Sequence, residues 1–379
     1  MKKILFTTNI PAPYTVLFFE NLGKQFDLTV VYERKEASNR DKAWFSEMGA
    51  MFKEEYLSGI NVGEEAAFCP SICRYLKKNF DLIIIGNYSS PTGILSILYL
   101  KLMHKKFCIH VDGGIRGERE GIKKYLKKFL LSSAFAFFSP GSVTDEYIKY
   151  YAGVKKKIFH YPFSSVKEKE IISNPLSMKD KKDLLKRIGL GANVNNNEFV
   201  ITSVGSVIYR KGYDVLLKAL VGMCHDIVVF IIGGKPTEDL EKLIKDNQLY
   251  NVHFVEFKKH ELIKEYLRAS DLFVLPTRYD IWGLVINEAL AAGVPVITSN
   301  KCVAGMQLIK DGYNGYIFKS EDSIELKKRI GEILSKDVYS REIMMRNCIC
   351  TAKGFTIEKM SQEYIRSIET LLQNGMENK

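Results

Sequence analysis

Two carboxylates, Asp280 and Glu288, stand around the start of one predicted helix in the segment PTRYDIWGLVINEALAAGVPVIT. A buried apolar strand precedes this segment, and a glycine turn at Gly283 comes directly before a helix that we expect over about 284–292. A loop that connects a buried parallel strand to a helix is a common place for an anionic ligand. These residue types therefore indicate a phosphate-containing ligand held between two carboxylates.

The amino-terminal end of this helix has groups that suit a diphosphate. The first amides of a helix have no intrahelical partners and carry about half a unit of positive charge. Here these amides belong to Gly283, Leu284 and Val285. Glu288, one turn inside the helix, has two acceptor oxygens for a vicinal diol such as a ribose, and Asp280 would face the group at the other end of the phosphates. The alternative is that Glu288 is a helix-surface carboxylate and Asp280 a partner of the helix dipole.

A pair of adjacent cations, Arg210 and Lys211, lies about 70 residues upstream of the carboxylates. The segment VITSVGSVIYRKGYDVLLKAL reads as a strand, Gly205, a polar loop that carries both cations, and a helix from about Tyr213. Two cations in such a loop can neutralise a phosphate group without a metal ion. The alternative is an exposed basic pair, which is common in a chain with 55 lysines and arginines.

Three motifs in this half of the chain, taken in order and spacing, resemble the retaining glycosyltransferases of family 4. The family pattern has a glycine-ended strand and a basic residue with Lys-Gly before a helix. It continues with Pro-Ser/Thr, a Glu, a Gly-Phe-Gly-like turn and a second Glu eight positions after the first. The matching residues are Gly205, Arg210, Lys211, Gly212, Pro276, Thr277, Asp280, Trp282, Gly283 and Glu288. A later stretch, 303–318, is similar to the family's glycine-bounded segment before its "DGxNG" turn.

Two positions depart from the family pattern. The first Glu of the motif is Asp280, which is one methylene shorter, and the acidic residue usual near Gln307 is an amide. Both departures concern contacts to the donor sugar more than contacts to the nucleotide.

Strands of parallel sheets are predicted in both halves, because short apolar runs alternate with helical patterns. In the first half the expected strands are 4–7, 28–31, 82–85, 107–111 and 134–138. In the second half they are 199–204, 227–232, 252–255, 272–275 and 294–297. Neither half shows G-x-G-x-x-G after a strand, which argues against a dinucleotide-dependent dehydrogenase.

The 379 residues are enough for two domains. The resemblance implies an α/β fold of the GT-B type, with two Rossmann-like, doubly wound domains that face a cleft. We expect an acceptor domain at 1–165 and a nucleotide-sugar donor domain at 166–355, with a polar, Asn-rich linker that begins near Tyr161 and ends at Glu198. A C-terminal helix at about 356–373 is expected to return to the first domain.

Composition and cysteine usage are those of a cytoplasmic globular protein. Apolar residues make up 46% of the chain, and the seven cysteines include no C-x₂-C pair, so reduced thiols are expected. The start MKKILFTTNI lacks a signal-peptide pattern, and no charge-free apolar run reaches 18 residues. No D-x-D motif occurs, which argues against a metal-dependent transferase of the other common architecture.

The net charge of +11 is concentrated in one segment. Between Lys101 and Lys128 nine basic residues oppose three acidic ones, and IKKYLKKFLL places apolar residues at helical spacing among paired lysines. We expect IKKYLKKFLL to form a basic amphipathic helix, so that the segment 101–130 can bind an anionic membrane surface, which would make the protein peripheral on the inner face of the cell membrane. The alternative is a normal surface helix with solvated lysines. No nucleic-acid partner is expected, because the aromatic residues lie at core spacing.

The acceptor half offers fewer chemical signals. In HVDGGIRGE, Asp112 follows a predicted strand and opens a glycine turn, whereas His110 lies inside the strand. Asp112 at the carboxyl end of the strand is the better candidate for facing an acceptor hydroxyl, and a turn-forming role is its alternative. His110 is expected to be a core histidine. The loop 9–14 is expected to line the acceptor side or the domain interface.

The resemblance implies an enzyme, a metal-independent retaining glycosyltransferase of the hexosyltransferase class that needs no cofactor and uses a UDP or GDP sugar as co-substrate. The acceptor would be a saccharide or a lipid-linked sugar, in cell-surface polysaccharide or glycolipid biosynthesis. The expected catalytic residues are Asp280, Arg210, Lys211 and Asp112. The expected donor-binding residues are Gly205, Ile281, Trp282, Gly283, Leu284, Val285 and Glu288, and no metal ligand is expected.

In the implied mechanism the departing diphosphate takes the acceptor proton on the face from which it leaves. Charge then grows on the diphosphate, where preorganised cations and amides are most effective. Two other enzyme activities stay open, namely a sugar-nucleotide epimerase of the same fold and a phosphorylase-like enzyme. A third alternative is a catalytically silent subunit that only binds a nucleotide sugar.

Overall fold

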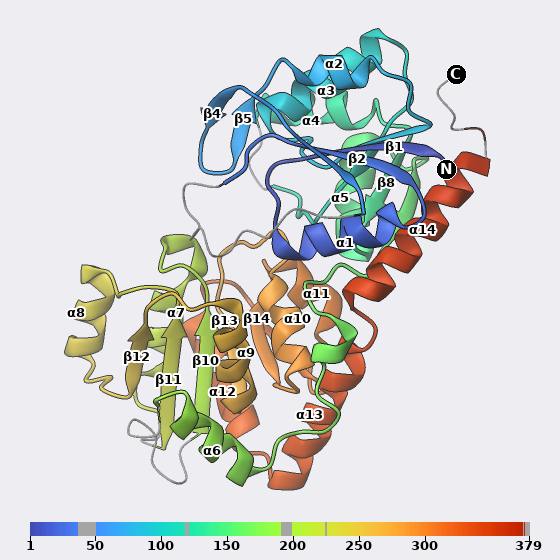
Figure 1. Ribbon diagram of the computed structural model, residues 1–379. Helices are drawn as coiled ribbons and strands as arrows, with labels where there is room; N and C mark the ends of the chain where they lie inside the picture. The colour runs from blue at the N-terminus through green and yellow to red at the C-terminus, as the bar shows by residue number, and fades with distance from the viewer. Residues whose placement is uncertain (37–50, 118–120, 191–198, 224–225, 374, 376–379) are drawn as a thin grey trace. The chain divides into compact units, whose positions relative to one another are not determined.

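The computed structural model of the chain describes residues 1–36, 51–117, 121–190, 199–223, 226–373 and 375 (Figure 1). The Asn-rich end of the expected linker, 191–198, and positions 118–120 of the basic segment lie outside the described residues. The chain divides into two compact units, one formed by Met1–Ser164 with Thr356–Lys379 and the other by Ser165–Phe355. The domain boundary expected from the sequence, between 165 and 166, lies one residue from this division.

Unit 1 is built on a parallel sheet with the strand order β3-β2-β1-β6-β7-β8-β9. Its strands are β1 Lys3–Thr8, β2 Asp27–Tyr32, β3 Lys53–Tyr56, β6 Leu82–Ile85, β7 Cys108–His110, β8 Ala136–Ser139 and β9 Lys157–His160. Its helices are α1 Pro13–Gly23, α2 Ile72–Leu76, α3 Pro91–Leu102, α4 Lys123–Leu131, α5 Ser142–Ala152 and α14 Ile357–Gln373. A small antiparallel hairpin joins β4 Ile60–Val62 to β5 Ala66–Phe68.

Unit 2 has a second parallel sheet, with the order β12-β11-β10-β13-β14-β15. Its strands are β10 Phe199–Val204, β11 Ile227–Ile232, β12 Val252–Val255, β13 Leu272–Leu275, β14 Val296–Ser299 and β15 Gly315–Phe318. The helices are α6 Met178–Arg187, α7 Tyr213–Leu220, α8 Glu238–Asp246, α9 His260–Ala269, α10 Leu284–Ala291, α11 Val303–Leu308, α12 Ser323–Leu334 and α13 Val338–Ala352. Short 3₁₀ turns occur at Glu168–Glu170 and Tyr209–Lys211.

Both sheets are buried on their two faces, which explains the continuous apolar strands. Every residue of β11 (IVVFII) and of β13 (LFVL) is buried, as expected where helices cover both sides of a parallel sheet. In unit 2 the strand order reverses between β10 and β13, and loops at the carboxyl ends of two such strands form the usual ligand site of an open α/β sheet. The prediction of two doubly wound, Rossmann-like sheets is confirmed.

The last strand of the glycine-turn segment is displaced from its expected position. We predicted it at 294–297, whereas β14 runs over Val296–Ser299. Gly293 has φ +69° after α10, and Val294 still donates to the carbonyl of Ala289 at 3.0 Å. Pro295 has no amide hydrogen for the sheet, so regular pairing begins at Val296.

The C-terminal helix α14 packs on unit 1 beside α1, as predicted (Figure 1). Its fully buried Tyr364 stacks on Phe138 of β8 with ring centroids 4.0 Å apart and meets Phe18 of α1 edge-on at 4.9 Å. The helix is thus anchored by an aromatic cluster that bridges β8 and α1.

A buried carboxylate ties together the carboxyl edge of the unit 1 sheet. Glu33, which directly follows β2, is 2% exposed and accepts hydrogen bonds from the Ser90 hydroxyl, the Asn87 amide and the backbone amide of Ala67. Asn87 in turn accepts from the Thr7 hydroxyl at 2.7 Å. Burial raises the pKa of Glu33, and the three donors act in the opposite direction. This network connects β2, the loop after β6, the N-cap of α3 and the hairpin.

Replacing Glu33 by Ala should lower the free energy of unfolding by about 3 kcal/mol, because three buried donors lose their acceptor. Chemical denaturation followed by circular dichroism measures this loss. Glu146→Ala, at an exposed position of α5, is the matched control and should change stability by less than about 0.5 kcal/mol. Equal stability of the two variants would contradict a structural role for the Glu33 network.

Candidate functional site

The two loops that carry the predicted cations and carboxylates meet at the carboxyl edge of the unit 2 sheet. One loop follows β10 and the other follows the adjacent β13. The carbonyl oxygen of Arg210 accepts from the amide of Arg278 at 2.8 Å and from the Thr277 hydroxyl at 3.0 Å, and the Arg210 guanidinium donates to the carbonyl of Tyr279 at 2.9 Å. These backbone contacts hold the two loops in one arrangement.

The predicted cations and one predicted carboxylate form a single cluster. The Nζ atom of Lys211 lies 2.6 Å from Oδ2 of Asp280, and Nη1 of Arg210 lies 3.3 Å from the same oxygen. The side chains of Lys211 and Asp280 are only 12% and 14% exposed, whereas that of Arg210 is 43% exposed. In the absence of another anion, Asp280 is therefore the counterion of both cations.

Two glycines are required for the close packing of these loops. Gly212 has φ +71°, and a Cβ there would lie 2.1 Å from the carbonyl oxygen of Pro276. Gly283 has φ +98°, and a Cβ there would lie 2.7 Å from Sγ of Cys302. A side chain at Gly212 would push the two loops apart, one at Gly283 would clash with Cys302 after β14, and either would strain the backbone. The predicted Gly205, at the end of β10, packs beside the Lys211 side chain.

A second arginine, Arg278, contacts residues on both sides of the cation loop. The Arg278 guanidinium binds Asp214 through two bonds of 2.9 Å each and Glu321 through one of 2.8 Å. It also lies over the ring of Tyr209 at 3.9 Å. A bidentate pair of this kind fixes the guanidinium plane, and with it the turn before Arg210. The sequence analysis did not identify Arg278, because its partners come from three separate segments.

The amino-terminal end of α10 is partly exposed, as an anion site requires. Gly283 caps the helix, and Leu284 and Val285 of its first turn are partly exposed. The Ile281 side chain is exposed. Trp282 is buried, and its indole nitrogen donates to Oδ1 of Asn287 at 2.9 Å, so its side chain braces the turn.

Glu288 lies one helical turn beyond Leu284, apart from the cation cluster. Its side chain is 13% exposed, and Oε1 accepts from the Ser165 hydroxyl at 2.9 Å and lies 3.9 Å from Nδ1 of His260. Burial raises the pKa of Glu288, while His260, Ser165 and Lys264 act against this increase. Sequence analysis missed Ser165 and His260, because neither residue belongs to a motif and only the fold brings them to α10.

The structure separates the roles of the two acceptor-side candidates in unit 1. His110 ends β7 and is 7% exposed, whereas the Asp112 side chain is 48% exposed. Nε2 of His110 lies 2.6 Å from Oδ1 of Asp112. In the expected acceptor-lining loop, Ile10 and Ala12 are buried, and Tyr14 packs on Phe163 with centroids 5.9 Å apart.

The basic segment of unit 1 forms an unusual surface. Only Leu130 and Leu131 of α4 are buried. The remaining apolar side chains at and near α4 are exposed, as are those along the neighbouring end of α3, namely Leu98, Leu102, Met103, Ile122, Tyr125, Leu126 and Phe129. We call this set the α3–α4 face.

Lysines of α4 lie on the side of the helix that meets α5. Lys124 and Lys128 each lie about 5 Å from the ring centre of Tyr150, and Lys127 lies 5.0 Å from that of Tyr151. The aliphatic stems of these lysines thus pack on tyrosine rings, and the apolar residues of α4 are left facing outward.

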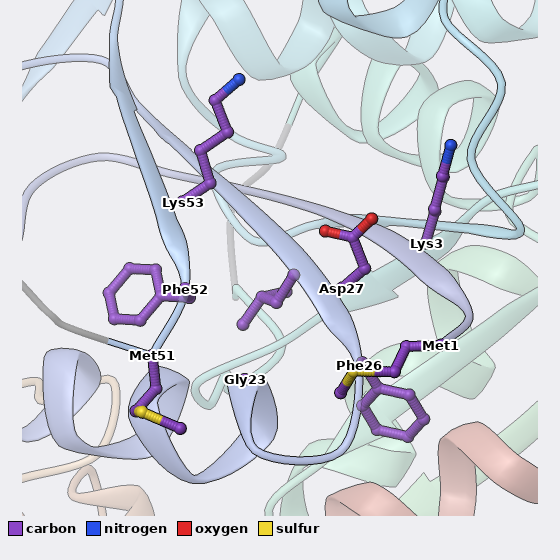
Figure 2. Close-up of a pocket in the computed structure, with 9 residues that line it drawn as sticks. Met1, Lys3, Gly23, Phe26, Asp27, Met51, Phe52 and Lys53 are labelled. Atoms are coloured by element: carbon purple, nitrogen blue, oxygen red, sulfur yellow. The ribbon is translucent and has the colours of Figure 1, made fainter.

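An open depression of about 700 Å³ on unit 1 contains none of the predicted residues (Figure 2). Lys3, Asp27 and Lys53, at the amino ends of β1, β2 and β3, line it. This is the sheet edge opposite the loops where parallel α/β sheets bind ligands.

Two negative observations concern the described residues alone. Among them, no group of three or more His, Cys, Asp or Glu side chains is arranged to hold a metal ion. Likewise, no helix in the described part of the chain combines the length and apolar character needed to cross a membrane.

Known proteins resemble this chain in both sequence and fold. An uncharacterized glycosyltransferase of Methanocaldococcus jannaschii is 30% identical over 195 residues, which is 50% of this chain and 47% of that protein. The UDP-Gal:α-D-GlcNAc-diphosphoundecaprenol α-1,3-galactosyltransferase of Escherichia coli is 24% identical over 89% of this chain and 87% of the enzyme. This chain thus matches about half the length of the first of these relatives.

Two solved structures show the same fold over nearly the whole chain. Sucrose-phosphate synthase from Thermosynechococcus elongatus superposes with a TM-score of 0.77 and 17% identity, over 99% of this chain and 100% of that one. Anabaena HepE in complex with UDP and glucose superposes with a TM-score of 0.72 and 17% identity, over 98% and 100%. The predicted GT-B fold is therefore confirmed.

The family model described as "Glycosyl transferases group 1" matches residues 191–355. This range contains the cation cluster, the α10 turn and Glu288. Residues 191–355 are therefore similar to the group 1 glycosyltransferases.

Proposed function

We propose that this protein transfers a sugar from a nucleoside diphosphate sugar, with retention and without a metal ion, to a saccharide or lipid-linked acceptor in cell-surface polysaccharide or glycolipid biosynthesis. The observation that carries this proposal is the cluster of Lys211, Arg210 and Asp280 beside the open amino end of α10. Its position at the reversal of strand order is typical of phosphate sites. The Escherichia coli relative named for a UDP-Gal donor supports a uridine diphosphate sugar.

The cluster is suited to stabilising a leaving diphosphate. Lys211 and Arg210 are already fixed in place by Asp280 and by the Tyr279 carbonyl, so little reorganisation is needed when a phosphate arrives. Lys211 and Arg210 both contact the same oxygen of Asp280. A diphosphate oxygen that binds these two cations would therefore compete with Asp280. The Asp280 carboxylate would then be available for hydroxyl groups of the donor sugar.

Two protein cations and the α10 amides would take the role that a divalent metal plays in other transferases. Charge that develops on the diphosphate during departure is then met by fixed positive groups. The diphosphate would take the acceptor's proton on the face from which the sugar departs, which gives retention. Asp112, the exposed carboxylate of unit 1, would bind an acceptor hydroxyl.

Glu288 would hold the ribose of the nucleotide. The Ser165 hydroxyl now lies 2.9 Å from Oε1 of Glu288. A ribose hydroxyl that binds Glu288 would either displace this hydroxyl or bind beside it. Charge-assisted hydrogen bonds from hydroxyl groups are stronger than neutral ones, so the ionised form of Glu288 is the binding form.

The α3–α4 face would bind an anionic membrane surface. A surface helix that packs on its own sheet buries its apolar side, whereas here Ile122, Tyr125 and Phe129 are exposed. Lysines border this apolar area, and they would attract acidic headgroups at about 1 kcal/mol for each contact. This surface would bring the enzyme to a lipid-linked acceptor.

Replacing Arg210 or Lys211 by Ala should lower sugar transfer by about 10²-fold or more, because charge stabilisation of this kind contributes about 3 kcal/mol. Turnover of UDP and GDP sugars by the purified variants, with and without EDTA, measures this effect. Lys235→Ala is the control, since Lys235 is exposed on the loop after β11 and pairs only loosely with Glu256 at 3.5 Å. Full activity of both variants, or strict dependence on added Mn²⁺, would refute the assignment.

Glu288→Gln should weaken binding of UDP itself, whereas Asp280→Asn should spare UDP affinity and lower turnover. Calorimetric titration with UDP and turnover of the same variants separate the two roles. Because burial raises the pKa of Glu288, wild-type affinity should fall as the pH drops toward that raised pKa, above the usual glutamate value of about 4.3. Glu288→Gln should lack this pH dependence, and exchanged phenotypes of the two variants would contradict the division of roles.

Changing Lys123, Lys124, Lys127 and Lys128 together to Gln should reduce binding to vesicles that contain acidic lipid by a few kcal/mol, at about 1 kcal/mol for each contact. Binding of wild type should also weaken with salt, since the screening length is about 10 Å at 0.1 M. Flotation with acidic and with neutral vesicles measures both effects. Lys179, Lys182 and Lys186 of α6 changed together to Gln form the control. Equal flotation of wild type and the α4 variant would show that these lysines are ordinary solvated surface residues and do not bind the membrane.

A further inference from the structure

A chain of three hydrogen-bonding groups leads from the C-terminal helix to the carboxylate at the end of β7. The hydroxyl of Tyr364 lies 2.9 Å from Nδ1 of His110, and Nε2 of His110 lies 2.6 Å from Oδ1 of Asp112. Tyr364 is fully buried, His110 is almost so, and the Asp112 carboxylate is half exposed. This series of hydrogen bonds thus begins in the core and ends at the surface.

Aromatic packing fixes the imidazole in this chain. Tyr161 stacks on His110 with centroids 5.0 Å apart and 23° between the planes, and Phe6 meets it edge-on at 5.5 Å. The Tyr161 hydroxyl donates to the carbonyl of Val111 at 2.8 Å, which fixes the backbone between His110 and Asp112. With rings on its sides and polar partners at both nitrogens, the imidazole has one orientation.

The order of Tyr364, His110 and Asp112 indicates which atom donates each hydrogen bond. Burial raises the pKa of Tyr364, so this tyrosine keeps its proton and donates it to Nδ1 of His110. With Nδ1 as the acceptor, Nε2 is the ring nitrogen that carries a proton, and it donates to Oδ1 of Asp112. Oδ1 is used within the protein, and the exposed carboxylate has its remaining acceptor capacity for a ligand.

We propose that His110 and Tyr364 are positioning residues that hold Asp112 for a hydrogen bond from a hydroxyl of the acceptor saccharide, an inference that rests on the proposed glycosyl transfer. The hydrogen bond between Tyr364 and His110 links the C-terminal helix to the end of β7 across 254 positions of sequence. The C-terminal helix is therefore part of the acceptor site as well as of the fold. If Tyr364 served only to pack the core, its ring would be needed but its hydroxyl would not.

Tyr364→Phe removes the hydroxyl and keeps the ring, so it tests the relay without emptying the core. The matched control is Tyr151→Phe in the same unit, because the buried hydroxyl of Tyr151 has no hydrogen-bond partner among the described residues. Loss of one neutral hydrogen bond that orients Asp112 should lower transfer about five- to tenfold, and Asp112→Asn should lower it further.

Three measurements decide the outcome. Transfer from UDP-galactose and UDP-glucose to octyl glycosides should fall in Tyr364→Phe and stay at the wild-type level in Tyr151→Phe. UDP affinity by calorimetry should be the same in both variants. Imidazole ¹⁵N spectra at pH 7 should show one histidine of wild type as the Nε2–H tautomer, with its Nδ1 resonance shifted by Tyr364→Phe.

Wild-type transfer in Tyr364→Phe would overturn the proposal, and so would a parallel loss of UDP affinity in that variant. An Nδ1–H tautomer at His110, or a Nδ1 resonance that ignores Tyr364→Phe, would also overturn it. If wild type binds no UDP or transfers no sugar, the proposed function fails, and the ¹⁵N spectra still decide whether the relay exists.

Discussion

The pairing of Lys211 and Arg210 with Asp280 is the interaction on which the rest of the site depends. Two cations held within 3.3 Å of one carboxylate oxygen need a rigid frame, because a charge cluster of this kind is costly when its geometry is loose. The frame is the parallel pairing of β10 with β13, which places two loops side by side at the edge of the sheet. Gly212 lets these loops approach, Gly283 leaves room for Cys302 after β14, and Arg278 is paired with Asp214.

The two carboxylates of the motif have different surroundings. Asp280 is tied to cations, whereas Glu288 lies one turn further along α10 and is bonded to Ser165 in a more enclosed place. Burial raises the pKa of Glu288. In the proposed reaction, the helix would carry the carboxylate for the ribose, and the turn before it would carry the carboxylate for the donor sugar.

The core strands of both sheets were predictable from the sequence, because buried parallel strands are continuous apolar runs. Peripheral elements such as β3 and β9 were missed, since their residues are only partly buried and mix charged with apolar types. In the site, Arg210, Lys211 and Asp280 were found because motif spacing identifies them. Ser165, His260 and Tyr364 could not be found, since their roles come from tertiary packing over separations of 123 and 254 residues that no local pattern encodes.

Calorimetric titration of uridine, UMP and UDP in metal-free buffer with EDTA tests the central claim most directly. If Lys211, Arg210 and the α10 amides bind the diphosphate, affinity should rise steeply from UMP to UDP, by about 1.5–3 kcal/mol for a hydrogen bond to a charged group. Uridine should then bind weakly at most. Equal affinity for UMP and UDP, or UDP binding that requires Mn²⁺, would contradict the account.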